Sequence, residues 1–189
     1  MILDLIKENR SYRRFDEAKP ILRTQLETMI EAARISPCAA NLQTLRFYIS
    51  ATPATNQAIY PHIKWAGYLR YWDGPVEGER PAAFILVLAP RGSSQFHHTD
   101  SGIAAQSILL TATEMNFGGC IIASLDKEAV HHNLSLPEDY SIVMAIALGV
   151  PAEKVTLDDV VDPDDIEYWR DDEDVHHVPK RALKDILIN

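Results

Sequence analysis

The chain has 189 residues, which is enough for one well-buried domain, and its formal net charge is -9, from 27 acidic and 18 basic residues. This acidic balance argues against a nucleic-acid partner or an anionic membrane surface, because phosphate binding needs an excess of Lys and Arg on some face. No apolar run approaches the roughly 18 residues of a membrane span, no signal peptide is evident, and Cys38 and Cys120 have no zinc or redox spacing. We therefore expect a single cytoplasmic domain over residues 1–189, with reduced thiols and no membrane partner.

The N-terminal part of the chain predicts a short helix over 3–9, a basic motif and a second helix. The motif, NRSYRRF over 9–15, places three arginines and a hydroxyl within five positions. Such a group can surround an anion, because Arg offers a planar fork of donors and Ser a short O–H donor; a solvated basic patch is the alternative. Thr24 and Glu27 have the spacing of a capping box, which predicts the second helix over 24–34.

Residues 36–43, SPCAANLQ, are small or carry amides, which suits either a plain connector or a loop that passes close to a flat ligand. Strands are expected over 46–50 and over 82–89, where the run AAFILVLA is typical of a fully buried strand. Between these strands, residues 53–81 are irregular and rich in Trp and Tyr. This composition favours a functional lid, and the alternative is that the aromatic side chains merely cover the core.

The longest predicted helix runs over 99–115, with Thr99 or Asp100 as its cap, and it is apolar on nearly every face. We expect it to be a central core helix that is buried on all sides. Asn116 and the adjacent glycines at 118 and 119 can provide its left-handed stop, and residues 120–123 then predict a short buried strand.

Past this strand, Asp126 can cap a helix to about residue 134, and residues 141–150 predict another buried strand. The acidic tail over 156–174 is expected to wander over the surface.

Three pairs of adjacent histidines occur at 97/98, 131/132 and 176/177. Adjacent residues point in different directions, so a pair is a poor chelate, and we expect surface or capping roles and no metal site. The chain has no G-x-G-x-x-G or Walker sequence, so a phosphate would have to be held by side chains.

Four motifs together resemble those of the nitroreductase family of FMN-dependent oxidoreductases, in the same order and over almost the whole chain. NRSYRRF over 9–15 is similar to R-R-S-x-R-x-F, and PCAANLQT over 37–44 is similar to P-S-x-x-N-x-Q-P. A helix that opens with D-x-G-x-A and closes with G-x-x-x-I is matched over 100–122, and a terminal P-K-R occurs at 179–181. The sequence departs from the family pattern at Asn9, which replaces an Arg and would leave a phosphate one charge fewer.

The resemblance implies an α+β fold with a central mixed, mostly antiparallel sheet, flanked by helices around a buried central helix, in a homodimer with FMN at the subunit boundary. It implies an enzyme that transfers hydride from NADH or NADPH through flavin N5 to an acceptor such as a nitroaromatic or a quinone. FMN carries the chemistry, so no catalytic side chain is required. The alternatives are a non-catalytic module that binds or stores flavin, and a relative that cleaves flavin or removes halogen.

The residues that the resemblance assigns to FMN are Arg10, Ser11, Arg13, Pro37, Cys38, Ala39, Asn41, Gln43, Ala123, Ser124, Lys180 and Arg181. Of these, the N-terminal pair at 10–11 and the C-terminal basic pair resemble the residues that hold the phosphate and ribityl chain, while Arg13 matches a cation near flavin N1 and O2. Residues 37–43 fall where the partner subunit contacts the flavin, although Cys38 replaces the family's Ser and Thr44-Leu45 its Pro-Trp. A backbone N–H at 123–124 falls where the family contacts flavin N5.

Overall fold

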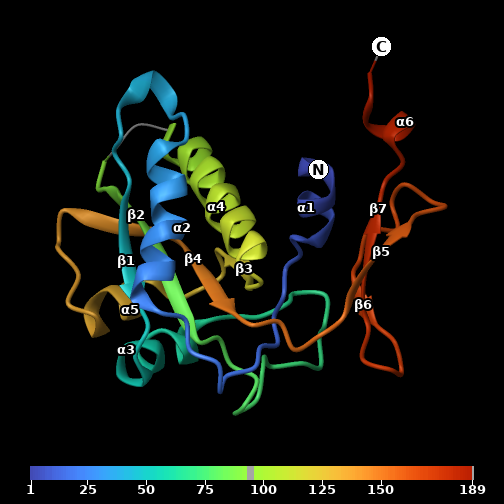
Figure 1. Ribbon diagram of the computed structural model, residues 1–189, viewed down its shortest axis with the longest axis horizontal. Coiled ribbons are helices and arrows are strands. Elements are labelled where there is room, and N and C mark those ends of the chain that lie inside the picture. The colour runs from blue at the N-terminus through green and yellow to red at the C-terminus, as the bar shows by residue number, and fades with distance from the viewer. Residues whose placement is uncertain (93–95, 189) are drawn as a thin grey trace.

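The computed structural model describes residues 1–92 and 96–188, and it contains a four-stranded sheet covered by helices and a separate three-stranded sheet (Figure 1). In chain order the elements are α1 (Ile2–Glu8), α2 (Arg23–Ile35), η1 (Ala39–Asn41), β1 (Arg46–Ser50), α3 (Pro53–Gln57), η2 (Tyr60–His62), β2 (Ala83–Pro90), α4 (Phe96–Glu114), β3 (Gly118–Ile122), α5 (Lys127–Asn133), β4 (Tyr140–Gly149), β5 (Val155–Asp159), β6 (Trp169–Arg170), β7 (His176–Lys180) and α6 (Leu183–Ile186).

The central sheet has the strand order β1-β2-β4-β3, and every neighbouring pair is antiparallel. Its strand β2 is buried on both faces because successive side chains point to opposite sides. Phe84 and Leu86 belong to one core cluster, whereas Ile85 and Val87 belong to the other, where they pack with α2 and α4. Burying a side chain of this size stabilises the fold by about 1.5–3 kcal/mol. The expected mixed α+β fold with a mostly antiparallel sheet is confirmed.

Several predicted elements match the structure closely. The strand expected over 46–50 is β1, and the apolar runs over 82–89 and 141–150 form β2 and β4 with one-residue shifts. The helix expected after Asp126 is α5, and the Asp126 carboxylate accepts a hydrogen bond from the Ala129 N–H at 3.0 Å. These segments are specified by local patterns, which explains why the sequence alone locates them.

The expectation for the start of the long helix is wrong. Within the described residues α4 already includes Phe96, so Thr99 and Asp100 lie inside the helix and do not cap it. Burial on all sides is also wrong for a single chain, because Ile103 is 37% exposed and Gln106 is exposed. The helix lies on one face of the central sheet (Figure 1), where it contacts α2 and α1, and Ile103 and Gln106 stay exposed among the described residues.

The left-handed stop predicted after α4 is confirmed for Asn116 but not for the two glycines that follow it. Asn116 has φ 63°, in the left-handed region, and provides the stop. Gly118 and Gly119 have no such φ and begin β3 instead. A Cβ on Gly118 would lie 2.5 Å from the ring of Tyr12, so this glycine is required for close packing against the N-terminal motif.

The second helix starts one residue before the position that the capping box predicts. α2 begins at Arg23, and its cap bond joins the Leu22 N–H to Gln25 Oε1 at 2.9 Å. Thr24 and Glu27 are therefore not its cap, although the expected apolar face is buried through Leu26 and its helical neighbours.

The irregular segment over 53–81 covers the face of the central sheet opposite α2 and α4. Ile59, Ile63 and Trp65 join the core cluster there, whereas Tyr71 is fully exposed. Coverage of the core thus accounts for part of the aromatic content, and a lid role for the exposed part stays a prediction.

The tail over 156–174 does not simply wander over the surface, which corrects the sequence expectation. It contributes β5 and β6 to a three-stranded sheet of order β5-β7-β6, in which β5 and β7 are parallel. Figure 1 shows this sheet apart from the central one, with α1 between β7 and α4. Among the described residues, no helix is long and apolar enough to cross a membrane.

Candidate flavin-binding site

A cavity of about 290 Å³ opens between the N-terminal motif, α4, β3 and β7, and we call it the basic cavity. Its lining contains cations and amides but no acidic residue: Asn9, Arg10, Ser11, Arg13, Gln106, Leu109, Ile121, Tyr168, His176, Val178 and Lys180. In a chain with a net charge of -9, such a lining concentrates positive potential in one place. The geometry therefore favours an anionic ligand.

The N-terminal motif reaches this cavity because it docks along β3. Ser11 forms a parallel bridge with Gly119, and the Tyr12 N–H donates to the Gly119 carbonyl at 3.0 Å. This contact places the motif beside the start of β3, and the parallel direction carries Arg13 along the strand.

A buried carboxylate, Glu153, fixes the motif from the other side. Its side chain is 1% exposed, and its Oε1 accepts hydrogen bonds from the backbone N–H groups of Arg13 and Arg14. Its Oε2 accepts from Arg170 Nη2 at 2.7 Å, so the same carboxylate joins the motif to β6. Burial lowers the pKa of Arg170, and the neighbouring Glu153 opposes that shift. Removing one partner of such a buried pair typically costs about 3–5 kcal/mol.

Arg10 and Lys180 provide donors that the chain itself leaves free. Arg10 Nη2 donates to the Ile6 carbonyl at 2.6 Å, but its Nε is buried and has no hydrogen-bond partner. Burial lowers the pKa of the Arg10 guanidinium. The Lys180 carbonyl accepts a hydrogen bond from the Val160 N–H, but its side-chain ammonium forms no hydrogen bond or ion pair with the rest of residues 1–92 and 96–188. An unpartnered buried donor beside a free ammonium is what a bound phosphate would satisfy.

Arg13 lies deeper, against two aromatic rings. Its Nη1 is 3.1 Å from His176 Nε2 and donates to the Ser11 carbonyl at 3.2 Å, while its guanidinium lies 4.7 Å from the centroid of the Tyr168 ring. His176 is 0% exposed. Burial, with a smaller contribution from Arg13, lowers the pKa of His176 to about 4. The imidazole is therefore neutral at neutral pH.

A smaller cavity of about 160 Å³ continues from the basic cavity and shares Arg13 and Tyr168 with it. Ala123 and Ser124 line it, and both are exposed. Their carbonyls accept hydrogen bonds from Leu125 and Lys64, whereas no turn or loop hydrogen bond of the described chain uses their N–H groups. These two N–H groups are thus available at a site adjoining Arg13.

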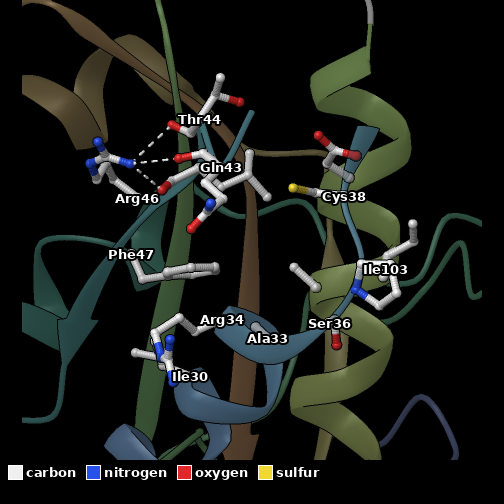
Figure 2. Close-up of a pocket in the computed structure, with 14 residues that line it drawn as sticks. Ile30, Ala33, Arg34, Ser36, Cys38, Gln43, Thr44, Arg46, Phe47 and Ile103 are labelled. Atoms are coloured by element: carbon white, nitrogen blue, oxygen red, sulfur yellow. Dashed lines mark hydrogen bonds between the residues drawn. The ribbon is translucent and has the colours of Figure 1, made fainter. Parts of the chain in front are cut away.

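The third cavity, about 340 Å³, lies between the end of α2, α4 and β1, and we call it the loop pocket. It is lined by Ile30, Ala33, Arg34, Ser36, Pro37, Cys38, Gln43, Thr44, Leu45, Arg46, Phe47, Asp100, Ile103 and Ala104. Figure 2 shows Phe47 and Ile103 on opposite sides of it, with Cys38 near its upper edge. Its walls are mostly apolar, unlike those of the basic cavity.

The loop over 36–43 is held by side chains from outside it, and the Ser36 hydroxyl lies 2.7 Å from that of Ser107 on α4. The Ala39 N–H donates to Asp100 Oδ1 at 2.8 Å, and Arg46 Nη1 donates to the carbonyls of Gln43 and Leu45 at 3.0 and 2.8 Å (Figure 2). Ala40, Asn41 and Gln43 have φ values of 48°, 54° and 50°, a left-handed conformation that is unfavourable for residues other than Gly. Such a concentration of strain is typical of functional loops.

The structure divides the residues assigned by resemblance into three groups. Arg10, Ser11, Arg13 and Lys180 line the basic cavity, Ala123 and Ser124 line the adjoining cavity, and Pro37, Cys38 and Gln43 line the loop pocket, with Ala39 and Asn41 in the same loop. Arg181 joins none of them, because its Nε donates to the Pro163 carbonyl and its Nη2 pairs with Asp164 at 3.4 Å.

Sequence reasoning missed Glu153, Tyr168 and His176. A usable signal existed only for the last, because His176, Val178 and Lys180 alternate along β7 and all line the basic cavity. Glu153 stands between Ala152 and Lys154, and no pattern there distinguishes it.

The expected surface role of the histidine pairs is only partly right. His98 and His132 are exposed, but two other members of the pairs are not. His131 and His176 are both buried, and His131 Nε2 lies 3.1 Å from the Tyr140 carbonyl oxygen. His177 bridges Asp158 and Asp171. Among the residues described, no group of three or more His, Cys, Asp or Glu side chains could hold a metal ion.

Comparison with known proteins agrees with this geometry. The sequence pattern of the Nitroreductase family matches residues 6–150. The chain is 26% identical over 188 residues to the CLA biosynthesis enone reductase of Lactiplantibacillus plantarum, a match that covers 81% of this chain and 87% of that protein.

Two solved structures share the architecture. One is the NADPH:FMN oxidoreductase from Vibrio harveyi complexed with NAD⁺, with 25% identity and a TM-score of 0.62, covering 80% of this chain and 69% of that one. The other is an FMN-dependent nitroreductase from Clostridium difficile R20291, with 20% identity and a TM-score of 0.66, covering 80% and 88%; at that identity the likeness concerns the fold alone. Because the family pattern spans more than half of the chain and the fold agrees with it, this protein belongs to the nitroreductase family.

Proposed function

We propose that this protein is an FMN-dependent oxidoreductase that takes hydride from NADH or NADPH and delivers it to a nitroaromatic or quinone acceptor. When bound, FMN supplies the ring that accepts hydride from the nicotinamide and returns it to the acceptor. The observation that carries the proposal is the basic cavity, whose lining contains no Asp or Glu and includes the unpartnered Arg10 Nε and the free ammonium of Lys180. This cavity adjoins the exposed segment at 123–124. The NADPH:FMN oxidoreductase from Vibrio harveyi named above supports the same cofactors.

In this proposal Arg10, Ser11 and Lys180 hold the phosphate. Arg10 offers a planar fork, Ser11 a hydroxyl and Lys180 a point charge, and no carboxylate in the lining competes for them. These residues fit a phosphate monoester, because its oxygens would satisfy the buried Arg10 Nε that the chain leaves without a partner.

Arg13 is proposed to face the pyrimidine edge of the flavin, where negative charge develops on reduction. No carboxylate pairs with its guanidinium in the described part of the chain, so its positive charge stays available. The N–H groups at 123–124 are proposed to face N5 and to orient the ring without acting as acids. No protein acid or base is then needed for hydride transfer.

We further propose a homodimer in which the loop over 36–43 completes the flavin site of the partner. Within one chain this loop lines a pocket different from the basic cavity. The exposed face of α4, with Ile103 and Gln106, has residues in the lining of both cavities and is uncovered in the single chain. A second copy would cover this face and bring the two cavities to one ligand.

The test is anaerobic reduction of the purified, FMN-loaded protein by NADH and by NADPH, followed by absorbance. We expect bleaching of the flavin band and its return on adding a nitroaromatic or a quinone, with an enone as a third acceptor because of the relative from Lactiplantibacillus plantarum. Protein that takes up no FMN would refute the proposal. Tight FMN binding without reduction by either nicotinamide would favour the non-catalytic flavin-binding alternative.

Sedimentation of the FMN-loaded protein tests the dimer separately. A stable monomer that retains a full complement of flavin would overturn both the homodimer and the assignment of the loop to the partner's site.

A further inference from the structure

The position of the Arg13 guanidinium depends on one neutral acceptor, His176. Arg13 has two side-chain hydrogen-bond contacts: Nη1 donates to the Ser11 carbonyl at 3.2 Å and lies 3.1 Å from His176 Nε2. The first contact is within the motif itself and moves with it. His176 belongs to β7, a separate element, and its ring lies 5.3 Å from that of Tyr168, which the guanidinium also covers.

The tautomer of His176 follows from its partner. A guanidinium can only donate, so Nε2 must be the acceptor and Nδ1 must carry the hydrogen. Nδ1 is buried and has no hydrogen-bond partner in the described structure. An unpaired buried donor is unfavourable, so the contact at Nε2 is the one that accounts for this orientation of the ring.

The charged groups around His176 keep it neutral. Arg13, Arg170 and His177 disfavour its protonation, Glu153 favours it, and burial is the largest effect, so that its pKa lies near 4. Protonation would remove the lone pair on His176 Nε2 that faces Arg13.

A carboxylate would be the stronger partner for a guanidinium, yet the nearby one is used differently. Glu153 bonds the backbone of Arg13 and pairs its second oxygen with Arg170, and it leaves the Arg13 side chain unpaired. A neutral acceptor orients the guanidinium without cancelling its charge, whereas a carboxylate in the same place would do both.

We propose that His176 is a positioning residue that holds the Arg13 guanidinium toward the bound flavin while leaving its full positive charge available to the reduced ring. This inference rests on the proposed FMN function. It assigns to His176 no contact with the flavin and no proton transfer.

The experiment compares three substitutions at this position. His176→Leu removes the acceptor, His176→Gln keeps a neutral acceptor, and His176→Glu introduces a charged one. For each variant the dissociation constants of oxidised and of reduced FMN are measured by flavin fluorescence and anaerobic titration, and the apoprotein's thermal midpoint is recorded. His131→Leu is the matched control, because His131 is also buried, but its Nε2 faces carbonyl oxygens and it lines neither cavity.

We expect His176→Leu to weaken binding of reduced FMN about tenfold more than that of oxidised FMN, the size of one charge-assisted hydrogen bond. His176→Gln should recover most of the preference for reduced over oxidised FMN. His176→Glu should lose this preference, because the glutamate holds the guanidinium but neutralises its charge. His131→Leu should lower the thermal midpoint without changing the preference.

Four outcomes would overturn the assignment. A folded His176→Leu protein with the wild-type preference shows that the contact has no role, and equal behaviour of the Gln and Glu variants shows that neutrality does not matter. Nitrogen-15 NMR of the apoprotein provides a readout without flavin, and a proton on Nε2 at neutral pH would exclude the Arg13 contact. A wild-type chain that binds no FMN would refute the proposed function, and this assignment with it.

Discussion

The basic cavity and the loop pocket hold their residues in place by different means. The first combines side chains from the N-terminal motif, α4, β3 and β7, and the buried carboxylate of Glu153 ties the motif to the second sheet. The second is built around one continuous loop, which Asp100 and Arg46 fix through its backbone. Charge thus dominates one region, and backbone shape dominates the other. Such a division suits a ligand with an anionic tail and a flat apolar ring.

The largest effect on flavin binding is expected from Arg10→Ala. Losing the charge-assisted hydrogen bonds to the phosphate should cost about 2–3 kcal/mol, or roughly a 30- to 150-fold rise in the FMN dissociation constant. Fluorescence titration measures the affinity, and urea denaturation checks that the fold persists. Arg23→Ala is the control, because Arg23 is exposed and, within residues 1–92 and 96–188, its side chain pairs only with Glu27 on α2. Equal FMN affinity in the Arg10 variant would disprove the phosphate assignment.

Lys180→Ala should give a smaller effect in the same cavity. Lys180 is exposed and acts as a point charge, so we expect roughly a fivefold loss of FMN affinity that shrinks as salt is added. Lys184→Ala, on the exposed helix α6, should leave the affinity unchanged. A salt-independent loss would indicate that Lys180 has a packing role instead.

Asp100→Ala tests whether the loop pocket is separable from the basic cavity. The substitution leaves the Ala39 N–H without its acceptor, and we expect a loss of about 1.5–3 kcal/mol in the free energy of unfolding. FMN affinity should fall by only a few-fold, because the phosphate contacts are untouched. Asp100→Asn keeps an acceptor oxygen and should recover most of the stability. If Asp100→Ala weakens FMN binding as much as Arg10→Ala, the two regions are not independent.

The smallest expected effect is on the pH dependence of stability, and it arises at His177 in the three-stranded sheet. Hydrogen bonds from His177 to Asp171 and Asp158 raise the pKa of His177, although burial opposes the shift. The folded state therefore binds this proton more tightly than the unfolded state. The resulting stabilisation is full below the unfolded value of about 6.5 and is lost as pH rises through the higher folded value.

We expect His177→Gln to reduce the loss of stability that occurs as pH rises through the folded pKa of His177. Urea denaturation at stepped pH measures this change. His176 should behave oppositely, because its pKa is lowered to about 4 and its effect on stability appears as pH falls below about 6.5. An unchanged alkaline slope in the His177 variant would show that the bridge does not form in solution.

Local sequence patterns located most of the central fold. The apolar run of β2, the cap at Asp126 and the small, amide-rich loop over 36–43 are all contiguous signals that neighbouring residues determine. The start of α4 was misplaced because Asp100 has the chemistry of a cap, but its carboxylate is used by the Ala39 N–H. A side chain's type thus indicated a polar contact without identifying its partner.

The C-terminal sheet shows where local patterns are insufficient. Residues 156–174 are too acidic and too interrupted to predict strands, and β5 and β6 form because β7 lies between them. The strand alternation that brings His176 and Lys180 to the same cavity could be recognised only after β7 was known to be a strand.

By itself the sequence determined the family, the positions along the chain of the segments that form the central strands, and the Arg, Ser and Lys side chains that could bind an anion. These features depend on residue type and short spacing. Only the tertiary structure decided which of those groups meet. Glu153 reaches Arg13 across 140 positions of chain, and no periodicity predicts that contact. The same is true of the neutral His176 beside Arg13, since its burial and its tautomer arise from the surrounding fold and not from its neighbours in sequence.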